Sequence, residues 1–407
     1  MTEARTASGN IVSTDLAYTF TVTRDHTLTA VFEKIPAYTI TATIDPPEAG
    51  TVSGAGKYQE GETVTLKAVP ADSYQFTGWQ ENGGTVSTEA EYTFTATGNR
   101  ELIAIFVAAP QYESGVDWWA AAMPLSAYWR TMAYGAGKFV ATTNNSTTYA
   151  YSANGTNWTK GTLPTNVGCR SIAYGGGKFV VVGDSNVALH SADGTTWAKA
   201  TLPSTQNWNG VAYGNGVFVA VSGGVSTTTT GNVAAYSTDG VTWTKATLPA
   251  SANWQKVAYG NGKFVATSYS GNNMKFAYST NGTTWKAASV SQGAANWSGI
   301  AYGSSRFVAL AAGSDKAVYS TDGITWTAAT LPSSGSWWAI TYGDGKFVAV
   351  CYNSNKAAYS SDGAAWVEAT LPSTANWRSI AYGDDKFVIA GYNGSKAAYS
   401  SKYGPAT

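Results

Sequence analysis

The stretch NWRSIAYGDDKFVIA, from Asn376 to Ala390, decides the fold, because close copies of it recur through the chain after residue 110. The shared core reads W-x-x-I-A-Y-G-x-x-K-F-V, and successive tyrosines lie 40, 39, 46, 43, 40 and 40 residues apart. The seven tyrosines of the copies are Tyr134, Tyr174, Tyr213, Tyr259, Tyr302, Tyr342 and Tyr382. A period near 40 residues with strand-like content predicts a propeller or a solenoid.

Each repeat divides into four short strands. In the third copy these are WNGVAYG, VFVAVS, NVAAYS and VTWTKA, and the last two are separated by an Asp-Gly pair. Asp-Gly or Asn-Gly between alternating strands indicates a tight hairpin, since both central residues of a type I′ turn need positive φ. The pair recurs at Asn154, Asp193, Asp239, Asn281, Asp322 and Asp362. We expect Asp193, Asp239, Asp322 and Asp362 to be structural turn residues.

The expected seventh hairpin is found at the start of the repeat region. GVDWWAAAMP at residues 115–124 matches GVTWTKATLP at 240–249, yet it precedes the first copy of the core motif. At the other end, AAYSSKYGPAT stops just after a third strand. We therefore predict that residues 115–123 supply the outer strand of the last blade and close a ring without open edges. The predicted fold of residues 110–407 is a seven-bladed β-propeller.

The N-terminal third carries a different repeat. Residues 9–32 align without gaps onto 83–106, so we expect the chain to open in the middle of a repeat and to be a fragment. Alternating segments such as YTITATI and ETVTLKAV indicate half-buried strands. We predict half a module over residues 1–34 and a complete small β-rich module over 35–109, acting as a stalk. The predicted fold class of the whole chain is all-β.

Two sequence signatures resemble known families. YQFTGWQENGG, from Tyr74 to Gly84, resembles the divergent internalin-type B-repeat of bacterial surface proteins. This resemblance implies a β-grasp-like or sandwich-like module strung in tandem. Trp79 within it is either a ligand platform or, as we favour, a core residue that anchors two strands.

The hairpin segment YSTDGVTW, with its relatives YSTDGITW and YSSDGAAW, resembles the Asp-box of sialidase-type (BNR-like) propellers, shortened by one residue between Asp and Gly. In that family the box is a structural hairpin away from the active site, so the resemblance implies the fold and not sialidase activity. Units of the form AYGNGKFVAV followed by YSTDGxTW also resemble those of phage tail-associated proteins and of Gram-positive surface proteins.

Composition excludes several classes of function. Lys plus Arg equals Asp plus Glu at 25 each, which leaves no basic field for nucleic acid. The 16 Trp and 25 Tyr, with only 12% charged residues, favour an exported protein. Cys169 and Cys351, with His26 and His190, do not form a metal-ligand pattern, so we expect no metal or cofactor. With no apolar leader and no long apolar window, we expect no membrane insertion.

Function is expected on one face of the disc. The first-to-second and third-to-fourth turns share one face and are nearly uniform, whereas the loops of the opposite face vary in sequence, as binding loops do. The residue that follows the repeated tryptophan also varies, and it reads Arg130, Arg170, Asn209, Gln255, Ser298, Trp338 and Arg378 around the ring.

Arg378, Arg130 and Arg170 fall on consecutive blades once the ring closes. Three guanidinium groups on one arc at the channel mouth would suit a carboxylate, a sulfate or a phosphate. The alternative is that they are solvated or pair with local acids such as Asp184.

The repeated tryptophans either stack on sugars, beside asparagines such as Asn207 and Asn253, or pack between blades, which their recurrence favours. Both interpretations of the tryptophans stay open, so they remain candidates, together with the variable residues that follow them and three tyrosines of the variable loops. The candidate ligand-binding residues are Arg130, Arg170, Arg378, Asn209, Gln255, Trp338, Trp129, Trp208, Trp254, Trp297, Trp337, Trp377, Tyr269, Tyr352 and Tyr392.

Catalysis has little support, because a glycosidase needs two carboxyl groups across one bond and the propeller has only Glu113 and Glu368 as glutamates. His190 replaces a third-strand tyrosine and is interpreted as a packing variant. We expect a non-catalytic carbohydrate- or receptor-binding propeller at the tip of a phage tail fibre or a bacterial surface adhesin. Such a protein would be extracellular, would bind a cell-surface glycan or protein receptor, and would oligomerise or attach to a larger fibre through its N-terminus. The alternatives are a sialidase-like glycoside hydrolase that uses the arginines, or a purely structural or protein-binding disc.

Overall fold

The computed structural model describes residues 2–15, 17–109, 112–224, 230–269, 275–290 and 295–405. Its elements are all β-strands, and they fall into two compact units, Met1–Gln111 and Tyr112–Thr407. No helix among the described residues is long and apolar enough to span a membrane.

The first unit contains two separate strand assemblies. The smaller is formed by β1 (Thr2–Thr6), β2 (Ile11–Ser13) and β3 (Leu28–Phe32), in which β1 pairs antiparallel with both neighbours. The larger contains β4 (Ala37–Asp45), β5 (Gly50–Ser53), β6 (Gly56–Gln59), β7 (Thr63–Pro70), β8 (Tyr74–Glu81), β9 (Gly84–Ser87), β10 (Glu91–Thr95) and β11 (Arg100–Ala108).

The larger assembly encloses its own core between two sheets. A five-stranded sheet has the order β6-β4-β11-β8-β9, and a three-stranded sheet has the order β10-β7-β5. Trp79 is fully buried between them against Leu66 and Phe106, as alternation of side chains along β7, β8 and β11 requires. Trp79 is therefore a core residue and not a ligand platform.

The second unit is the propeller, and its strands follow the fourfold division of each repeat. Its first strands are β12 (Trp119–Gly135), β13 (Lys138–Thr143), β14 (Thr148–Ser152), β15 (Thr159–Thr162), β16 (Ser171–Gly175), β17 (Lys178–Val182), β18 (Val187–Ser191), β19 (Ala198–Thr201), β20 (Trp208–Gly214), β21 (Val217–Ser222) and β22 (Gly231–Ser237). The others are β23 (Thr244–Ala252), β24 (Trp254–Gly260), β25 (Lys263–Ser268), β26 (Phe276–Ser279), β27 (Lys286–Val290), β28 (Asn296–Gly303), β29 (Arg306–Ser320), β30 (Thr325–Gly343), β31 (Lys346–Ser360), β32 (Val367–Gly383) and β33 (Lys386–Ser401).

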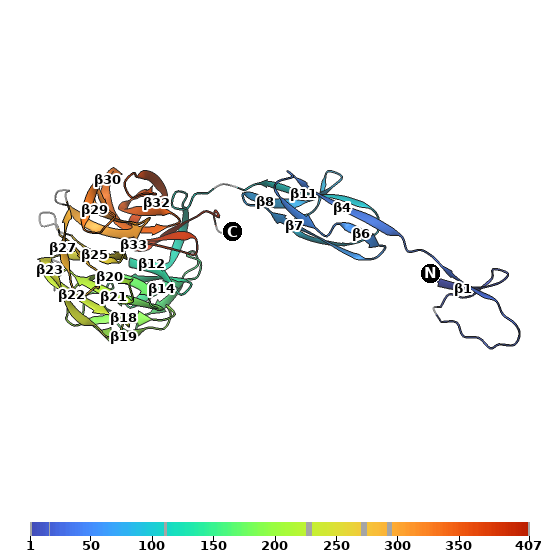
Figure 1. Cartoon of the computed structure of the whole chain (residues 1–407), viewed down its shortest axis with the longest axis horizontal. Coiled ribbons are helices and arrows are strands. Elements are labelled where there is room, and N and C mark those ends of the chain that lie inside the picture. Colours follow the sequence, from blue (N-terminus) through green and yellow to red (C-terminus); the bar gives the residue numbers. More distant parts are fainter. Residues whose placement is uncertain are drawn as a thin grey trace. The chain divides into compact units, whose positions relative to one another are not determined.

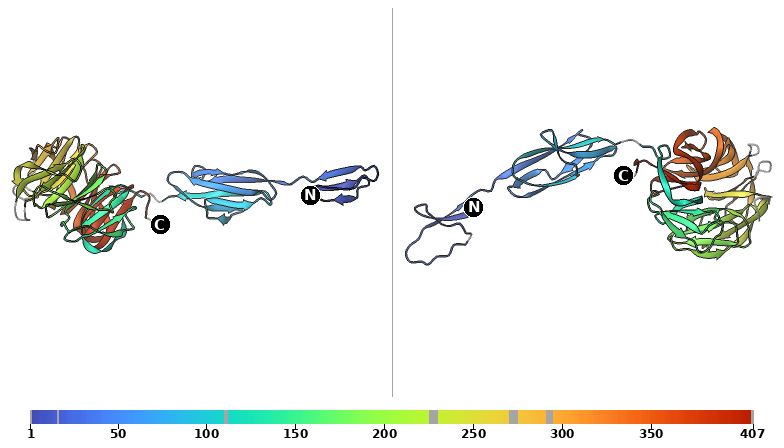
Figure 2. Two further views of the ribbon diagram at one scale, coloured as in Figure 1. Left: turned by 90° about the horizontal axis from the view of Figure 1, so that it is seen from below. Right: turned by 180° about the vertical axis from the view of Figure 1, so that it is seen from behind.

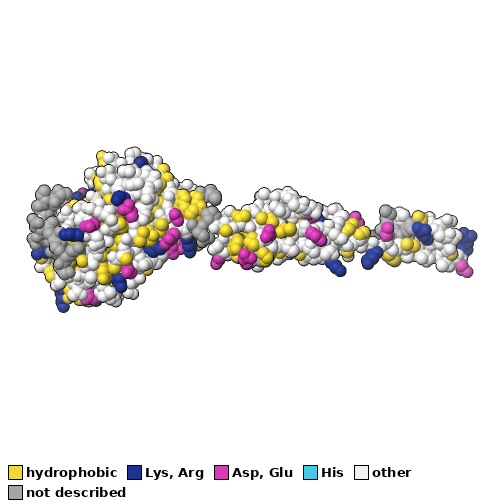
Figure 3. Space-filling view, turned by 90° about the horizontal axis from the view of Figure 1, so that it is seen from above, with side chains coloured by type: hydrophobic (Ala, Val, Ile, Leu, Met, Phe, Trp, Pro, Cys, Tyr) yellow, Lys and Arg dark blue, Asp and Glu magenta, His cyan; other side chains and the backbone are white. Residues whose placement is uncertain are grey.

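The pairings of these strands form groups of four antiparallel segments, one group for each copy of the motif. Six strands are longer than one segment of a blade, namely β12 and β29 to β33. Each of them forms two successive segments, because hydrogen-bonded pairing continues along the loop that connects the two. Basic and acidic side chains are interspersed on the propeller face shown in Figure 3, as the balanced composition leads one to expect.

The two ends of the propeller unit meet in one blade. β12 pairs antiparallel with β33, with Trp119 opposite Tyr399, and Figures 1 and 2 show the two strands side by side. The N–H of Gly115 donates to Oγ of Ser400 at 2.7 Å, and the indole N–H of Trp118 donates to the Gly115 carbonyl at 3.1 Å. Residues at the start of the unit therefore complete the turn and the outer strand of the last blade.

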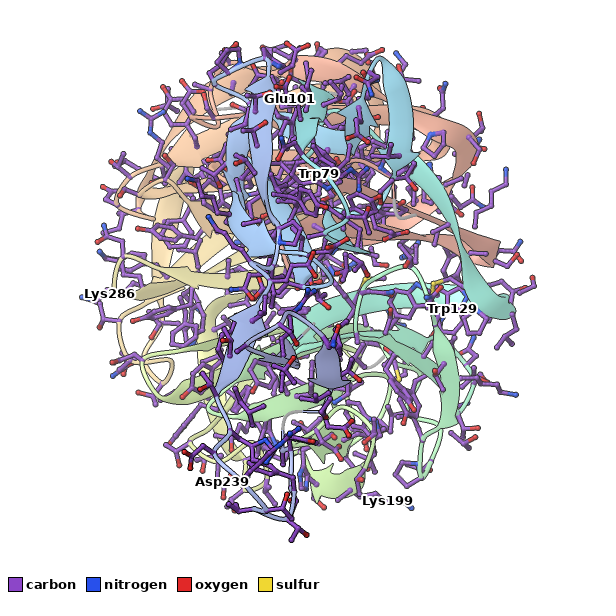
Figure 4. All side chains as sticks on the ribbon, turned by 90° about the vertical axis from the view of Figure 1, so that its right-hand side faces the viewer. Trp79, Glu101, Trp129, Lys199, Asp239 and Lys286 are labelled. Atoms are coloured by element: carbon purple, nitrogen blue, oxygen red, sulfur yellow. The ribbon has the colours of Figure 1, made fainter. Side chains whose placement is uncertain are left out.

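The bond between the glycine N–H and the serine hydroxyl recurs in the hairpins of the other six blades, where both residues belong to one continuous segment. In the third blade, Asp239 Oδ1 accepts the N–H groups of Val241 and Thr242 at 2.8 and 2.7 Å, and Ser237 Oγ accepts the Gly240 N–H at 2.8 Å. These backbone donors hold the pKa of Asp239 well below its ordinary value. Corresponding bonds are made by Asp193, Asp322 and Asp362. These aspartates organise turns, and Asp239 lies well apart from Trp129 on the propeller (Figure 4).

Adjacent blades are held together by a contact between glycine and tyrosine. A Cβ atom added to Gly214 would lie 2.0 Å from Cγ of Tyr259 in the next blade, so only glycine allows the ring to lie this close to the backbone. The same contact joins Gly135 to Tyr174, Gly175 to Tyr213, Gly260 to Tyr302, Gly303 to Tyr342, Gly343 to Tyr382 and Gly383 to Tyr134. The last of these joins the final blade to the first and completes the ring.

Removal of residues 112–124 tests the closure. The deletion takes away the outer strand of the last blade and Met123, which is 3% exposed, and should lower the free energy of unfolding by several kcal/mol. We expect thermal unfolding followed by circular dichroism to show a much lower propeller transition. Removal of residues 2–13 from the other unit is the control and should leave that transition in place. A propeller transition unchanged by the first deletion would contradict the closure.

Candidate functional site

A pocket of about 200 Å³ lies at the ends of the inner strands, on the face that carries the variable loops. We call it the arginine basin. It is lined by Arg130, Arg170, Asn207, Asn209, Asn253, Gln255, Tyr269, Trp338 and Arg378. The structure thus brings together seven of the predicted ligand-binding residues, from six repeats of the motif.

The convergence follows from a β-bulge, because in six blades the pairing register of the inner strand shifts between the tryptophan and the second residue after it. The repeated tryptophan is fully buried between the blades, and the residue after it lies at the bulge and lines the pocket. One position of the repeat therefore supplies Arg130, Arg170, Asn209, Gln255, Trp338 and Arg378 to a common space. Ser298 occupies the same position but is buried, and its hydroxyl donates to the Trp337 carbonyl at 2.6 Å.

Arg170 is the arginine with an acidic partner. Its Nε is ion-paired with Oδ1 of Asp184, and its Nη1 donates to Oδ1 of Asn209 at 3.1 Å. The expected alternative, pairing with a local acid, thus holds for this residue. Burial, followed by the positive charges of Arg130 and Arg378, lowers the pKa of Arg170 to about 10.

Arg378 is held by aromatic rings. Its guanidinium carbon lies 4.3 Å from the ring centroid of Trp338 and 4.9 Å from that of Tyr392, which is cation–π geometry. Burial and the charge of Arg130 lower the pKa of Arg378 to about 10, and burial also lowers the pKa of Arg130. Within the described parts of the chain, neither Arg130 nor Arg378 forms a salt bridge, so their charges are available to a ligand.

Lys256 is a functional candidate that sequence analysis missed. Together with the three arginines it lines a narrow neck below the basin, and it also lines a cavity of about 170 Å³ in the channel beneath. Burial, and then the charges of Arg130, Arg378 and Arg170, lower the pKa of Lys256 to about 7. The sequence contains a signal for Lys256, because the other blades have small residues at this position, two residues after the repeated tryptophan. These residues are Thr131, Ser171, Gly210, Gly299, Ala339 and Ser379.

The prediction that the repeated tryptophans contact a ligand is wrong. All six are 0% exposed, because their rings fill the spaces between blades. The indole N–H of Trp254, for example, donates to the Ala250 carbonyl at 3.2 Å, so its one donor is already used. The tryptophans that this correction removes from the site are Trp129, Trp208, Trp254, Trp297, Trp337 and Trp377.

The three predicted loop tyrosines have different positions. Tyr269 lines the basin, and its ring centroid is 5.9 Å from that of Trp338. Tyr392 lies against Arg378 at the edge of the basin. Tyr352 packs against Trp338 with 6.2 Å between ring centroids, and it is not among the residues that line the basin. It therefore contacts the indole outside the basin.

Carboxyl groups are scarce around this site. Asp184 is ion-paired with Arg170, Glu113 lies 2.5 Å from Nζ of Lys346, and Glu368 lies 3.2 Å from Nζ of Lys356. None of the described residues that line the basin is acidic. In the part of the chain that the structure describes, no cluster of His, Cys, Asp and Glu could hold a metal ion.

Comparisons with known proteins concern the two units separately. Residues 40–110 match the model of the divergent InlB B-repeat domain. A comparison with curated protein sequences finds no match. The prediction of a B-repeat in the N-terminal part is confirmed for this segment.

Solved structures are similar to the propeller. Virginiamycin B lyase from Staphylococcus aureus has a TM-score of 0.62 at 15% identity, covering 70% of this chain and 99% of that chain. YCF48 bound to D1 peptide has a TM-score of 0.56 at 17% identity, covering 72% and 98%. The WD40 domain of Neurospora crassa Pan2 has a TM-score of 0.52 at 8% identity, covering 73% and 98%. At these identities the likeness shows the fold alone, and it confirms the predicted all-β propeller class.

Lys256 should make anion binding depend on pH. Because its pKa in the folded protein is about 7, it is mostly neutral at pH 8 and mostly charged at pH 6, and the charged form adds a fourth cation. Affinity for sulfate should rise as pH falls, by at most about tenfold between these values, which is the change in the protonated fraction. Isothermal titration at constant ionic strength measures it.

Lys256→Met is the matched variant, since it keeps the length of the side chain and removes the titrating group. It should bind sulfate with the same affinity at pH 6 and pH 8. A wild-type affinity that does not change with pH, or a variant that keeps the dependence, would contradict the role of Lys256.

Proposed function

We propose that the propeller is a non-catalytic receptor-binding domain that holds an anionic sugar of a cell-surface glycan in the arginine basin. The observation that carries the proposal is the convergence of three guanidinium groups from consecutive blades, two of them without an acidic partner among the described residues. Guanidinium groups match carboxylate and sulfate oxygens geometrically, and burial strengthens such bonds.

The other lining groups favour a sugar over a bare inorganic anion. Asn207, Asn253 and Gln255 provide amide donors and acceptors of the kind that bind hydroxyl groups. Tyr269, which lines the basin beside Trp338, provides an aromatic ring for the apolar side of a pyranose. A volume of about 200 Å³ fits one monosaccharide unit.

The scarcity of carboxyl groups supports binding without turnover. Hydrolysis of a glycosidic bond by the usual route needs an acid and a second carboxylate on the two sides of that bond. Asp184, the carboxylate that contacts the basin residue Arg170, is committed to that ion pair. A sialidase-like hydrolase that uses the arginines is the alternative that a turnover assay addresses.

The setting we propose is extracellular, on a phage tail fibre or a bacterial surface adhesin. The B-repeat match supports it, because that repeat is named for a bacterial surface protein family. A second candidate function is recognition of a protein, through an acidic side chain or a C-terminal carboxylate in the same basin. The propeller YCF48, whose structure holds a D1 peptide, favours this candidate.

A glycan array with wild-type protein and Arg378→Gln tests the proposal. Wild-type protein should select carboxylated or sulfated glycans over their neutral counterparts. Arg378→Gln should weaken binding of the selected glycans by about 10- to 100-fold in isothermal titration, as expected for loss of hydrogen bonds to a charged group. Lys199→Gln, an exposed cation on β19 that Figure 4 labels, is the control and should bind like wild type.

Several outcomes would refute the proposal. Equal binding of neutral glycans, or an Arg378→Gln variant that binds like wild type, would remove the arginine basin as the site. Release of product from a selected glycan, abolished by Arg378→Gln, would establish the hydrolase alternative. An array without binding, together with capture of acidic peptides, would favour the protein-binding candidate.

A further inference from the structure

We propose that a second groove beside the arginine basin binds a neutral sugar unit, so that the ligand is an oligosaccharide with its acidic unit in the basin. This inference rests on the proposed function and specifies its ligand. The groove has a volume of about 400 Å³ and lies among the loops of the last two blades and the connection into the first. Its lining includes Ser126, Asn353, Asn376, Tyr392, Asn393 and Lys396, and we call it the asparagine groove.

The basin and the groove share a boundary. Tyr392 lines the groove, and the guanidinium carbon of Arg378, a basin residue, lies 4.9 Å from the centroid of the Tyr392 ring. Asn376, which lines the groove, is two residues before Arg378 in the same strand, β32. Tyr128 supports the Tyr392 ring at a centroid distance of 5.2 Å. A ligand that leaves the basin past Arg378 therefore reaches the groove directly.

The groove offers amides that the protein itself does not use. The side chains of Asn353, Asn376 and Asn393 form no hydrogen bond with other described residues, and each can donate and accept. Asn353 and Asn393 occupy the same position in the loops of consecutive blades, YNSNK and YNGSK, and both have left-handed backbones with φ of 53° and 63°. The two asparagines thus line the groove from equivalent backbone positions in consecutive blades.

The chemistry of the lining favours a neutral unit over a second acidic group or a peptide. Among the described lining residues the one charged side chain is Lys396, and one of its three N–H donors bonds to the Thr374 carbonyl at 2.8 Å. Apart from the ring of Tyr392, the only apolar side chain in the lining is that of Ala375, so there is no apolar pocket for a peptide side chain. Several amides and one aromatic ring are the groups that recognise the hydroxyls and the apolar face of a neutral hexose.

The test compares short and long probes with the same acidic unit. The short probes are the methyl glycosides of sialic acid and glucuronic acid, and the long probes are 3′-sialyllactose and a hyaluronan tetrasaccharide. For the acid that the basin accepts, wild-type protein should bind the long probe about tenfold more tightly than the short one, through hydrogen bonds in the groove.

The variant Asn353→Gly/Asn393→Gly removes both amides, and glycine accepts the left-handed backbone without strain. It should lose the tenfold gain of the long probe and keep wild-type affinity for the short one. Asn145→Gly is the control, because Asn145 also has a left-handed backbone, with φ of 59°, and lies outside the groove.

The outcomes separate this inference from the proposed function. If none of the four probes binds, the proposed function fails for carboxylated sugars, and the inference fails with it. If a short probe binds but the long probe binds no more tightly, only the inference fails. The inference is also overturned if the double variant weakens both probes equally, or if an acidic peptide shows the dependence on Asn353 and Asn393 in place of the long probes.

Discussion

The contact between a glycine of one blade and the tyrosine ring of the next is the constraint on which the propeller depends. At Gly214 a side chain would have to occupy space 2.0 Å from an atom of the Tyr259 ring, so the backbone and the ring are as close as chemistry allows. The contact recurs around the whole ring and includes Gly383 with Tyr134 across the closure. It fixes the spacing of the blades, and it explains why the pair Tyr-Gly is constant in a motif whose other positions change.

Because the frame is rigid, variation at one position of the repeat is enough to build a binding site. Each buried tryptophan anchors an inner strand, and the β-bulge that follows it places the next residue at the central pocket. Different side chains at one position of the repeat are thereby directed into one pocket. Three arginines and Lys256 share that space, and among the described residues Asp184 is the carboxylate that pairs with one of them. The ligand-free site therefore carries buried positive charges that repel one another, and this repulsion lowers the pKa of Arg170 and of Lys256 after burial itself. An anion relieves this repulsion, which makes its binding more favourable than at an exposed cluster.

Much of the fold could be predicted because its signals are periodic. The copies of the motif define the blades, and the match of GVDWWAAAMP to GVTWTKATLP locates the segment that pairs with β33. The arginines could be placed together because a closed ring makes the first and last repeats neighbours. The burial of the tryptophans could not be decided from recurrence alone, because a repeated aromatic residue can either pack or present a surface.

Two features of the site depend on conformation that the sequence does not state directly. The role of Lys256 depends on the strand geometry, which directs its position into the channel, where the other blades have small residues. The asparagine groove depends on the left-handed loops at Asn353 and Asn393 and on the Tyr392 ring beside Arg378. Lys256 is a single departure from the repeat, and the groove lies in loops whose sequence varies between blades. Both signals are therefore weaker in sequence than the repeat itself.

The most direct test asks whether the residue after the repeated tryptophan determines ligand binding without determining the stability of the propeller. The test variant carries, at this position, residues that other blades already have there. Arg130→Asn, Arg170→Gln and Arg378→Ser introduce the residues found at Asn209, Gln255 and Ser298. The measurement is the melting temperature of this triple variant with and without an acidic glycan that stabilises wild-type protein. We predict a melting temperature equal to or above that of wild type, because repulsion is removed, and no rise with the glycan. A propeller that no longer unfolds cooperatively, or one that is still stabilised by the glycan, would contradict the account.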